Sequence, residues 1–553
     1  ELLVLRRDDS PQPRHKRLVS GLIGHEPQAC STRAKTSSTP GQPACRGRHR
    51  RDPVNGHEAA LEGELAEALA APAEQFAGLA AWTAGEARWL DHGDREKLIG
   101  EEGRRLQKDL LQATFRLDAA LEKRARDVTS AAGIRHGTLE RGCERGLASI
   151  FGPVTVTRMA YRNRKEPNLY PADARQALPA DPYSLGMRAL AARELAVSGF
   201  GQAQAGIEDR TGVKIGHAQL SDIADDLARW TGDFYEERAR DADEDPPAGD
   251  VIMMQADGKG IAMRPEHRRS KGKDDGTRPG IKKMAEIVAV ADFTPAVREP
   301  EDIAAPPARR RAHPGPKARD KWVSASVTEA IEDMITAAFD EADRRDPHRI
   351  RQRVFLVDGN KQQIAAIEAE AERRKLKIPV LIDYIHVSGY IGKASAALHP
   401  DDPVLAGQWA DGQLLRVLHG RAKAVAATLA SVARRTRANP RRKHLDLADV
   451  DRAVTYLENN RQHMKYDKAL EKGWPIATGL IEGSCRYVIE DRFGITGARW
   501  SPEGAETILK IRAVVVNGDL DDYMDYYKGR YRREHHLARY DEATIEALNL
   551  DAA

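Results

Sequence analysis

Three acidic residues stand where an apolar stretch of the chain meets a turn or a helix start. Asp257 follows VIMMQA, Asp358 follows RVFLV, and Glu482 lies within IATGLIEGSCR. An apolar run that ends in a carboxylate holds a charge at the edge of a core, where a partner such as a metal ion must offset the lost hydration. If two or three of these carboxylates converge, their oxygens form a magnesium site.

Each aspartate also has a simpler structural explanation. Asp257 and Asp358 both precede glycine, and Asp-Gly is a favoured hairpin dipeptide, while an aspartate before a helix can cap it. The catalytic interpretation is favoured because two such acids end successive apolar runs and a third lies on an apolar helix. Glu482 is near a helix start, where the helix dipole favours an ionised carboxylate.

A competing candidate for the second acid is Asp383 in LIDYIHV, which also ends an apolar strand and has His386 three residues later. If VFLVDG is the fourth strand of a sheet, the topology favours Asp358 as the second acid. Asp383 and His386 would then be supporting residues at the end of the neighbouring strand. An Asp and His at this spacing more often form a structural hydrogen bond than a catalytic base. The sequence leaves the choice between Asp358 and Asp383 open.

The composition indicates a modular protein. A chain of 553 residues is too long for one hydrophobic core. Its net charge of +3 means that a nucleic-acid surface must come from local clusters of Arg and Lys. The four cysteines match no CxxC pairing, which argues against a disulfide framework or a structural zinc site and fits a reducing cytoplasm. No apolar stretch reaches the roughly 18 residues of a membrane span, so we expect no membrane partner.

The pattern predicts an α/β fold, with an RNase H-like catalytic core and an α-helical insertion, plus a mainly α-helical N-terminal DNA-binding region. Four strand signals between residues 251 and 387, with helical stretches between the later ones, are typical of an RNase H-like domain. In such a sheet the first strand is central and the next parallel strand lies beside it, so Asp257 and Asp358 would face one another. A helix carrying Glu482 would close the cluster around two magnesium ions.

The expected N-terminal segments are a disordered or non-native extension (1–57), an α-helical region (58–145), a β-hairpin segment (146–182) and a helix-turn-helix region (183–245). The expected C-terminal segments are the first part of the core (250–402), the α-helical insertion (403–474), the last core helix (475–515) and a helical tail (516–553). In the helix-turn-helix region, the segment from His217 would be the recognition helix. A plain three-helix scaffold explains this pattern equally well.

Basic and aromatic residues flank the proposed site. Clusters of Arg and Lys occur in RPEHRRSKGKDDGTRPGIKK, ARRRAHPGPKARDKW and ARRTRANPRRKH, as a DNA channel requires, although solvated loops have similar composition. The candidates for contacts to DNA are Lys259, Arg486, Arg492, Arg499 and, for base stacking, Trp500. The simpler explanation of Arg486 is an ion pair with Glu482 four residues earlier on the same helix.

Several motifs together resemble a known family. They are QADGKGIAMRPE, RVFLVDGN, VLIDYIHV and the block GWPIATGLIEGSCRYVIEDRFGITGARWSPEGAETILKIRA, with FGPVTVTRMAYR and NLYPAD upstream. The chain resembles bacterial insertion-sequence transposases of the DDE class, in the Kra-type group related to mutator-like transposases, from about Leu106 to Tyr527. In the related mutator-like pattern, the second acid is followed by glycine and, further on, by a motif of one Cys and one His. LIDYIHV occupies the place of that motif here, with Asp383 where the pattern has Cys.

The resemblance implies an RNase H-like domain interrupted by an α-helical insertion, with an N-terminal region that binds terminal inverted repeats. Its catalytic acids would be Asp257, Asp358 and Glu482, and they would hold two Mg²⁺ ions, or Mn²⁺, for DNA cleavage and strand transfer. The partners would be double-stranded DNA, both element ends and target, and further copies of the chain in a dimer or larger synaptic assembly at the bacterial nucleoid. The alternatives are a non-catalytic helix-turn-helix DNA-binding protein and an RNase H-like nuclease without strand transfer.

Overall fold

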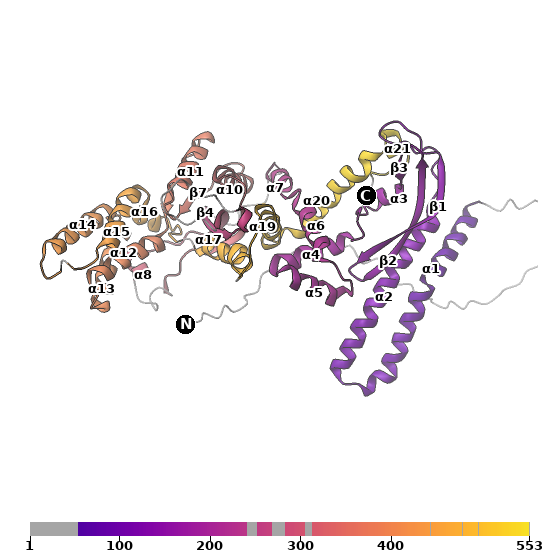
Figure 1. Cartoon of the computed structure of the whole chain (residues 1–553), viewed down its shortest axis with the longest axis horizontal. Helices are drawn as coiled ribbons and strands as arrows, with labels where there is room; N and C mark the ends of the chain where they lie inside the picture. The colour runs from indigo at the N-terminus through magenta and orange to yellow at the C-terminus, as the bar shows by residue number, and fades with distance from the viewer. Residues whose placement is uncertain are drawn as a thin grey trace, which may run out of the picture. The chain divides into compact units, whose positions relative to one another are not determined.

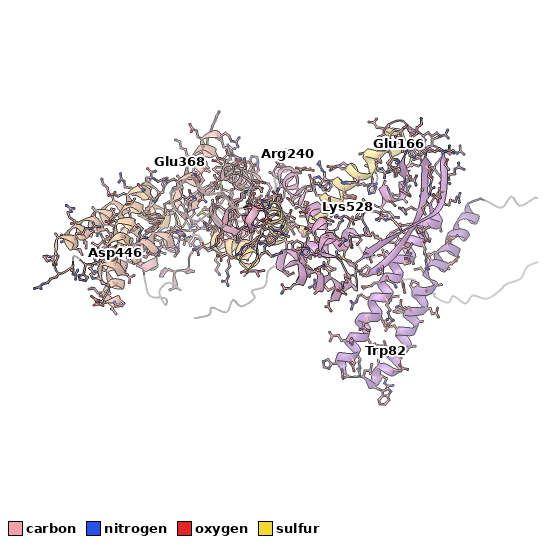
Figure 2. All side chains as sticks on the ribbon, in the orientation of Figure 1. Trp82, Glu166, Arg240, Glu368, Asp446 and Lys528 are labelled. Carbon is pink, nitrogen blue, oxygen red and sulfur yellow. The ribbon has the colours of Figure 1, made fainter. Side chains whose placement is uncertain are left out.

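The computed structural model describes residues 53–240, 251–267, 282–304, 312–442, 444–477, 479–495 and 497–551, with side chains from residue 63 onward. Most of the expected extension 1–57 and parts of the first two basic clusters lie outside these residues. Residues 60–553 form one compact unit of mixed α/β structure with two sheets. Charged side chains such as Glu368 and Lys528 project from its helices (Figure 2). No helix in the described ranges has both the length and the apolar content needed to cross a bilayer.

The N-terminal part begins with helices and continues as an antiparallel sheet. Its elements are α1 (Pro53–Ala84), η1 (Glu86–Trp89), α2 (His92–Leu121), β1 (Thr138–Ser149), β2 (Gly152–Asn163) and β3 (Glu166–Leu169) (Figure 1). The sequence placed residues 138–145 in a helical region, but they belong to β1. β1 pairs with β2 from Thr138 opposite Arg162 to Ser149 opposite Gly152. The backbone hydrogen bonds of this pairing outweigh the local preference for a helix.

Five helices follow the small sheet: α3 (Pro171–Arg175), α4 (Leu185–Val197), α5 (Phe200–Thr211), α6 (His217–Ala228) and α7 (Thr231–Arg240). Helix α6 buries Leu220, Ile223 and Leu227, as its apolar spacing predicts, and packs against α4. His217 is exposed at its first position, with its ring 4.8 Å from that of Phe200. The role of α6 as a recognition helix stays a prediction.

The larger sheet has the strand order β6-β5-β4-β7-β8, with β4 in the centre. Its strands are β4 (Val251–Ala262), β5 (Lys282–Phe293), β6 (Ala318–Ser326), β7 (Gln352–Val357) and β8 (Val380–Ile382). The pairs β4/β5 and β5/β6 are antiparallel, whereas β4/β7 and β7/β8 are parallel. The first six residues of β4 are buried, as expected for a central strand covered on both faces.

Helices cover both faces of this sheet, and β5 shows the alternation. Val288 and Val290 belong to the hydrophobic cluster that includes Met334 of α10 (Ile331–Arg345), whereas Ile287 belongs to the cluster that includes Ile508 of α19 (Pro502–Asn517). The remaining connections near the sheet are η2 (Pro265–His267), α8 (Pro300–Ala304) and α11 (Lys361–Arg373). Side chains that alternate along one strand therefore anchor two separate layers of helices.

Beyond β8 the chain is helical to its described end. Its elements are α12 (Tyr384–Leu398), α13 (Pro403–Leu418), α14 (Ala422–Ala438), α15 (Ala448–Asn460), η3 (Arg461–His463), α16 (Tyr466–Glu471), α17 (Gly479–Ser484), η4 (Cys485–Glu490), α18 (Asp491–Phe493), α19, α20 (Leu520–Tyr531), η5 (Arg532–His536), η6 (Leu537–Arg539) and α21 (Glu542–Ala547). The expected single core helix over 475–515 is interrupted, because Gly497 has a positive φ of 83° and Ser501 caps a new helix that starts at Pro502.

Candidate metal centre

Three aspartates occupy the same level of three neighbouring parallel strands. The pairs that fix the register are Gln255 with Leu356 and Val357 with Ile382. Continued along the strands, this register brings Asp257 level with Asp358, and Asp358 level with Asp383. Parallel neighbours lie about 4.8 Å apart, so the three acids form a row at the carboxyl ends of β7 and β8. We call Asp257, Asp358 and Asp383 the aspartate row.

Asp257 is the first partly exposed residue after the six buried residues of β4. Its Oδ1 accepts a hydrogen bond from the backbone N–H of Gly258 at 2.7 Å, and its Oδ2 accepts one from Sγ of Cys485 at 3.3 Å. The thiol lies on η4, so the carboxylate faces the helical segment that follows Glu482. The expected position of Asp257, at the edge of the core, agrees with this burial pattern.

Asp358 begins the turn after β7, and a helix of the insertion holds that turn. Its Oδ1 accepts a hydrogen bond from the backbone N–H of Asn360 at 2.8 Å, and the Tyr456 hydroxyl on α15 donates to its backbone carbonyl at 2.7 Å. Gly359 has a φ of 102°, and a Cβ there would lie 3.2 Å from the Tyr456 ring and hydroxyl. Glycine is therefore required both by the backbone conformation and by the close approach of Tyr456.

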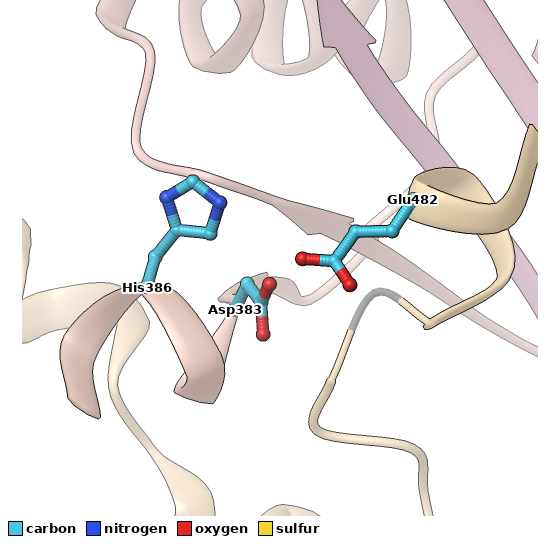
Figure 3. A group of neighbouring side chains, drawn as sticks. All are labelled: Asp383, His386 and Glu482. Atoms are coloured by element: carbon cyan, nitrogen blue, oxygen red, sulfur yellow. The ribbon is translucent and has the colours of Figure 1, made fainter. Parts of the chain in front are cut away.

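Asp383 is fully buried and caps α12, its Oδ1 accepting from the backbone N–H of Ile385 at 2.8 Å. His386, in the first turn of α12, and Glu482, in the first turn of α17, are both exposed. One ligand atom from each of Asp383, His386 and Glu482 lies within 4.8 Å of the others. Figure 3 shows Glu482 facing Asp383 and His386 across the gap between the two helix starts. This acid and histidine cluster could hold a metal ion.

A hydrogen bond to β4 and a π-helical segment position Glu482. The backbone N–H of Ile481 donates to Oε1 of Gln255 at 2.9 Å, which attaches the start of α17 to the central strand. After Ser484 the chain continues as the π-helix η4. The buried Arg512 donates from Nε to the carbonyl of Val488 at 2.8 Å and from its guanidinium to that of Tyr487. The pKa of Arg512 is lowered to about 10, chiefly because the guanidinium is buried. The two carbonyls of the π-helix supply the hydrogen-bond acceptors that this buried group needs.

The structure thus brings together one of the three acids predicted from the sequence, Glu482, with the alternative pair Asp383 and His386. Asp257 and Asp358 occupy the adjoining positions of the aspartate row, so the cluster and the row meet at Asp383.

Sequence reasoning missed two residues at this edge of the sheet. Glu286 of β5 is half-buried. Its pKa is raised, mainly by burial and also by the nearby charges of Asp257 and Asp358. Burial, and then the charges of Asp358 and Asp383 among others, also raise the pKa of Tyr456. Glu286 carries a signal in the sequence, because it is a charged residue within an apolar strand. Tyr456 carries none, since it lies 98 residues after the turn that it holds.

The candidates for DNA contacts differ in how accessible they are. Arg486 and Arg499 are exposed, and Arg486 lies near Asp491 rather than in the expected pair with Glu482. Lys259 forms an ion pair with Glu490, and this hydrogen bond raises the pKa of the lysine. Arg486 and Arg499 are therefore open to solvent and Lys259 is partly so, and their contacts to DNA stay a prediction.

Arg492 lies in the interior of the fold, and Trp500 is partly buried beside it. Arg492 is only 4% exposed, and its guanidinium lies 4.7 Å from the centre of the Trp500 ring and 5.8 Å from that of Phe200. The Trp500 ring packs on Phe493, and its backbone bonds to Ala262 and Arg264. Because its ring partners already enclose it, we leave Arg492 out of the DNA surface proposed below.

The Cys485 thiol should be almost unreactive in the folded protein. Burial, followed by the neighbouring Asp257 carboxylate, raises the pKa of this thiol well above its ordinary range, and only the thiolate is nucleophilic. Peptide mapping after iodoacetamide treatment at pH 8 should show labelling of Cys485 at least about 100-fold slower than that of the half-buried Cys143. Both should react at similar rates in guanidinium chloride. Equal rates in the native protein would show that Cys485 is open to solvent.

The ligand atoms of the cluster fit a divalent cation. Two carboxylates supply hard oxygen donors, and the imidazole adds a nitrogen that suits Mn²⁺, Fe²⁺ or Zn²⁺ better than Mg²⁺. Three protein ligands would leave coordination positions free for substrate oxygens or water. The residues are therefore compatible with one ion at the cluster, and a second ion belongs to the proposal below.

Comparison with known proteins adds little to this geometry. No protein-family model matches the chain, and no curated protein matches it significantly. Among solved structures, the chain is similar to part of the Drosophila P element transposase strand transfer complex, with 11% sequence identity and a TM-score of 0.22. The match covers 67% of this chain and 86% of that chain. A likeness this weak carries no argument about fold or activity.

Proposed function

We propose that this chain is a DNA transposase of the DDE class, which binds the ends of an insertion sequence and catalyses metal-dependent strand cleavage and strand transfer. The observation that carries the proposal is the aspartate row together with Glu482, which lies within 4.8 Å of Asp383 on a separate helix. Carboxylates that converge from several elements at one edge of a sheet are an arrangement suited to phosphoryl transfer.

The topology supports an RNase H-like core for this site. Three antiparallel strands precede two parallel ones, and β4, the first strand of this sheet along the chain, lies in its centre. Helices α13 to α16 separate β8 from the helix that carries Glu482, as an α-helical insertion within such a core would. The motifs that carry Asp257, Asp358 and Asp383 lie on or directly after β4, β7 and β8, and the C-terminal block that resembles Kra-type transposases runs from before α17 into α19.

In this proposal Asp257, Glu482 and one or both of Asp358 and Asp383 hold two divalent cations. Bound cations would activate the attacking oxygen and stabilise the leaving oxygen of an in-line displacement. The protein supplies orientation: backbone N–H groups fix one oxygen each of Asp257, Asp358 and Asp383, and so leave little reorganisation for the reaction step. Arg486 and Arg499 are proposed to contact the DNA backbone.

Supercoiled plasmid that carries the DNA flanking the coding sequence tests the proposal. With Mg²⁺ or Mn²⁺ we expect nicked product at the element ends, followed by joined product. Because two ends must be paired, the active species should be a dimer or a larger assembly, which native mass spectrometry with DNA would detect. Binding without nicking would leave a DNA-binding protein, and nicking without joining would leave a nuclease.

A further inference from the structure

A basic pocket lies at the start of the parallel strands of the larger sheet, at the end opposite to the aspartate row. Its volume is about 400 Å³, and its walls come from the residues that start β7, the segment that leads into β8, and the loop after α16. Five cationic side chains line it, and no carboxylate does so among the described residues: Arg349, Arg351, Arg353, Lys377 and Lys472. We call this cavity the amino-end pocket, since it lies at the amino ends of the parallel strands.

Buried ion pairs fix the arginine wall of the pocket. The side chain of Arg351 is only 4% exposed and donates to Asp292 at 2.7 Å, while the equally buried Arg353 pairs with Asp343 and Asp346. Asp343 also pairs with two further arginines, Arg349 and Arg374. Burial acts to raise the pKa of Asp343, but hydrogen bonds from Arg353 and Arg374 prevail and lower it. Of the three guanidiniums that share Asp343, Arg353 also pairs with Asp346, and Arg374 also pairs with Asp340 and Glu370. These ion pairs hold the arginine wall in place, and the uncompensated charge of the pocket comes from its lysines.

The two lysines add charge without a carboxylate partner. Lys377 and Lys472 are exposed, and neither forms an ion pair within the described ranges. The ammonium of Lys472 lies 4.5 Å from the centre of the Trp474 ring, which places it beside an apolar wall of the pocket. In addition, the Nε atoms of Arg351 and Arg353 are buried without a hydrogen-bond acceptor among the described atoms. Two lysines without a carboxylate partner, beside a wall of guanidiniums, favour an anion with several oxygens.

We propose that the amino-end pocket binds a phosphate group, and that the phosphate is part of a DNA backbone. The choice of DNA as the source rests on the proposed function, whereas phosphate binding itself does not. The six residues of β7 span about 20 Å, so a phosphate held here lies about that far from the aspartate row. At roughly 3.4 Å per base pair, this is about six base pairs along a duplex. The pocket would therefore hold DNA at a distance from the reacting strand.

The double variant Lys377→Gln/Lys472→Gln tests the pocket. Lys393→Gln/Lys423→Gln is the matched control, because all four lysines are exposed and lack ion pairs in the described part of the chain, and the control pair lies outside the proposed DNA contacts. Affinity for a random-sequence 30-base-pair duplex is measured by fluorescence anisotropy over a range of salt concentrations. All solutions contain EDTA, so the aspartate row takes no metal. Losing two phosphate contacts should reduce the slope of log affinity against log salt by about 2, with unchanged circular dichroism.

A second arm titrates inorganic phosphate and pyrophosphate by calorimetry into wild type and both variants. A reduced salt slope in the pocket variant alone supports the proposal with DNA as the source. Loss of pyrophosphate binding with an unchanged salt slope keeps the phosphate site but overturns DNA as its source. If the pocket variant matches the control in both arms, the proposal is wrong. Since no step requires cleavage, the result is independent of whether the chain proves to be a transposase.

Discussion

Replacing Glu482 by glutamine should reduce metal-dependent DNA cleavage by roughly 10³-fold and leave folding unchanged. Glutamine keeps the size of the side chain and removes the charge that would hold a cation opposite Asp383 and His386. The side chain is exposed in the first turn of α17, so it makes little contribution to the core. The rate is measured by nicking of supercoiled plasmid in saturating Mn²⁺ and in saturating Mg²⁺.

Glu503→Gln is the matched control for this substitution. Glu503 is also an exposed glutamate in the first turn of a helix, α19, and it lies outside the acid and histidine cluster. Its loss should leave cleavage within about twofold of wild type, since the general effect of one surface charge is small. Equal cleavage by the two variants would remove Glu482 from the site.

The second large effect separates Asp358 from Asp383. We expect Asp358→Asn to reduce cleavage by roughly 10³-fold, and Asp383→Asn to reduce it less while raising the metal concentration needed for half-maximal rate. Asparagine is the proper replacement because Asp383 caps α12, and asparagine preserves a cap whereas alanine loses about 1 kcal/mol. Similarly, an asparagine at position 358 can still accept from the backbone N–H of Asn360.

The comparison is read from plasmid nicking over a Mn²⁺ titration, with thermal unfolding as the check on folding. Normal cleavage by Asp358→Asn together with an inactive Asp383→Asn would make Asp383 the second catalytic acid. Loss of activity in both, at every metal concentration, would mean that the two acids act as a unit across β7 and β8.

The strands that carry the aspartates could be predicted from the sequence because their signals are local. Each of Asp257, Asp358 and Asp383 follows a short, mostly apolar run that contains Val or Ile, which is enough to predict a buried strand and its end. The central position of β4 follows from the order of strands and helices. These features need no knowledge of side-chain contacts.

The partners of the acids could not be predicted because they depend on tertiary packing. That Glu482 meets Asp383 and His386 depends on where α17 attaches to β4, through a bond between residues 226 positions apart. Whether Arg492 points to solvent or into the core depends on Phe200, from a distant helix, which the periodicity of the C-terminal block does not reveal. The change from an α-helix to a π-helix after Ser484 likewise accompanies contacts from the distant, buried Arg512, which donates to the carbonyls of Tyr487 and Val488.

The π-helix η4 constrains the number of residues in the segment 479–493 as strictly as it constrains their identity. Residues 479–493 are helical throughout, with Ile481 bound to β4 at one end and Val488 and Ile489 in the core at the other. A π-helix holds one residue more per hydrogen-bonded turn than an α-helix. Deleting one residue would rotate the two anchors relative to each other by about 100°, so the segment could not keep both in place. Single-residue deletions here should be far less tolerated than substitutions at its exposed positions.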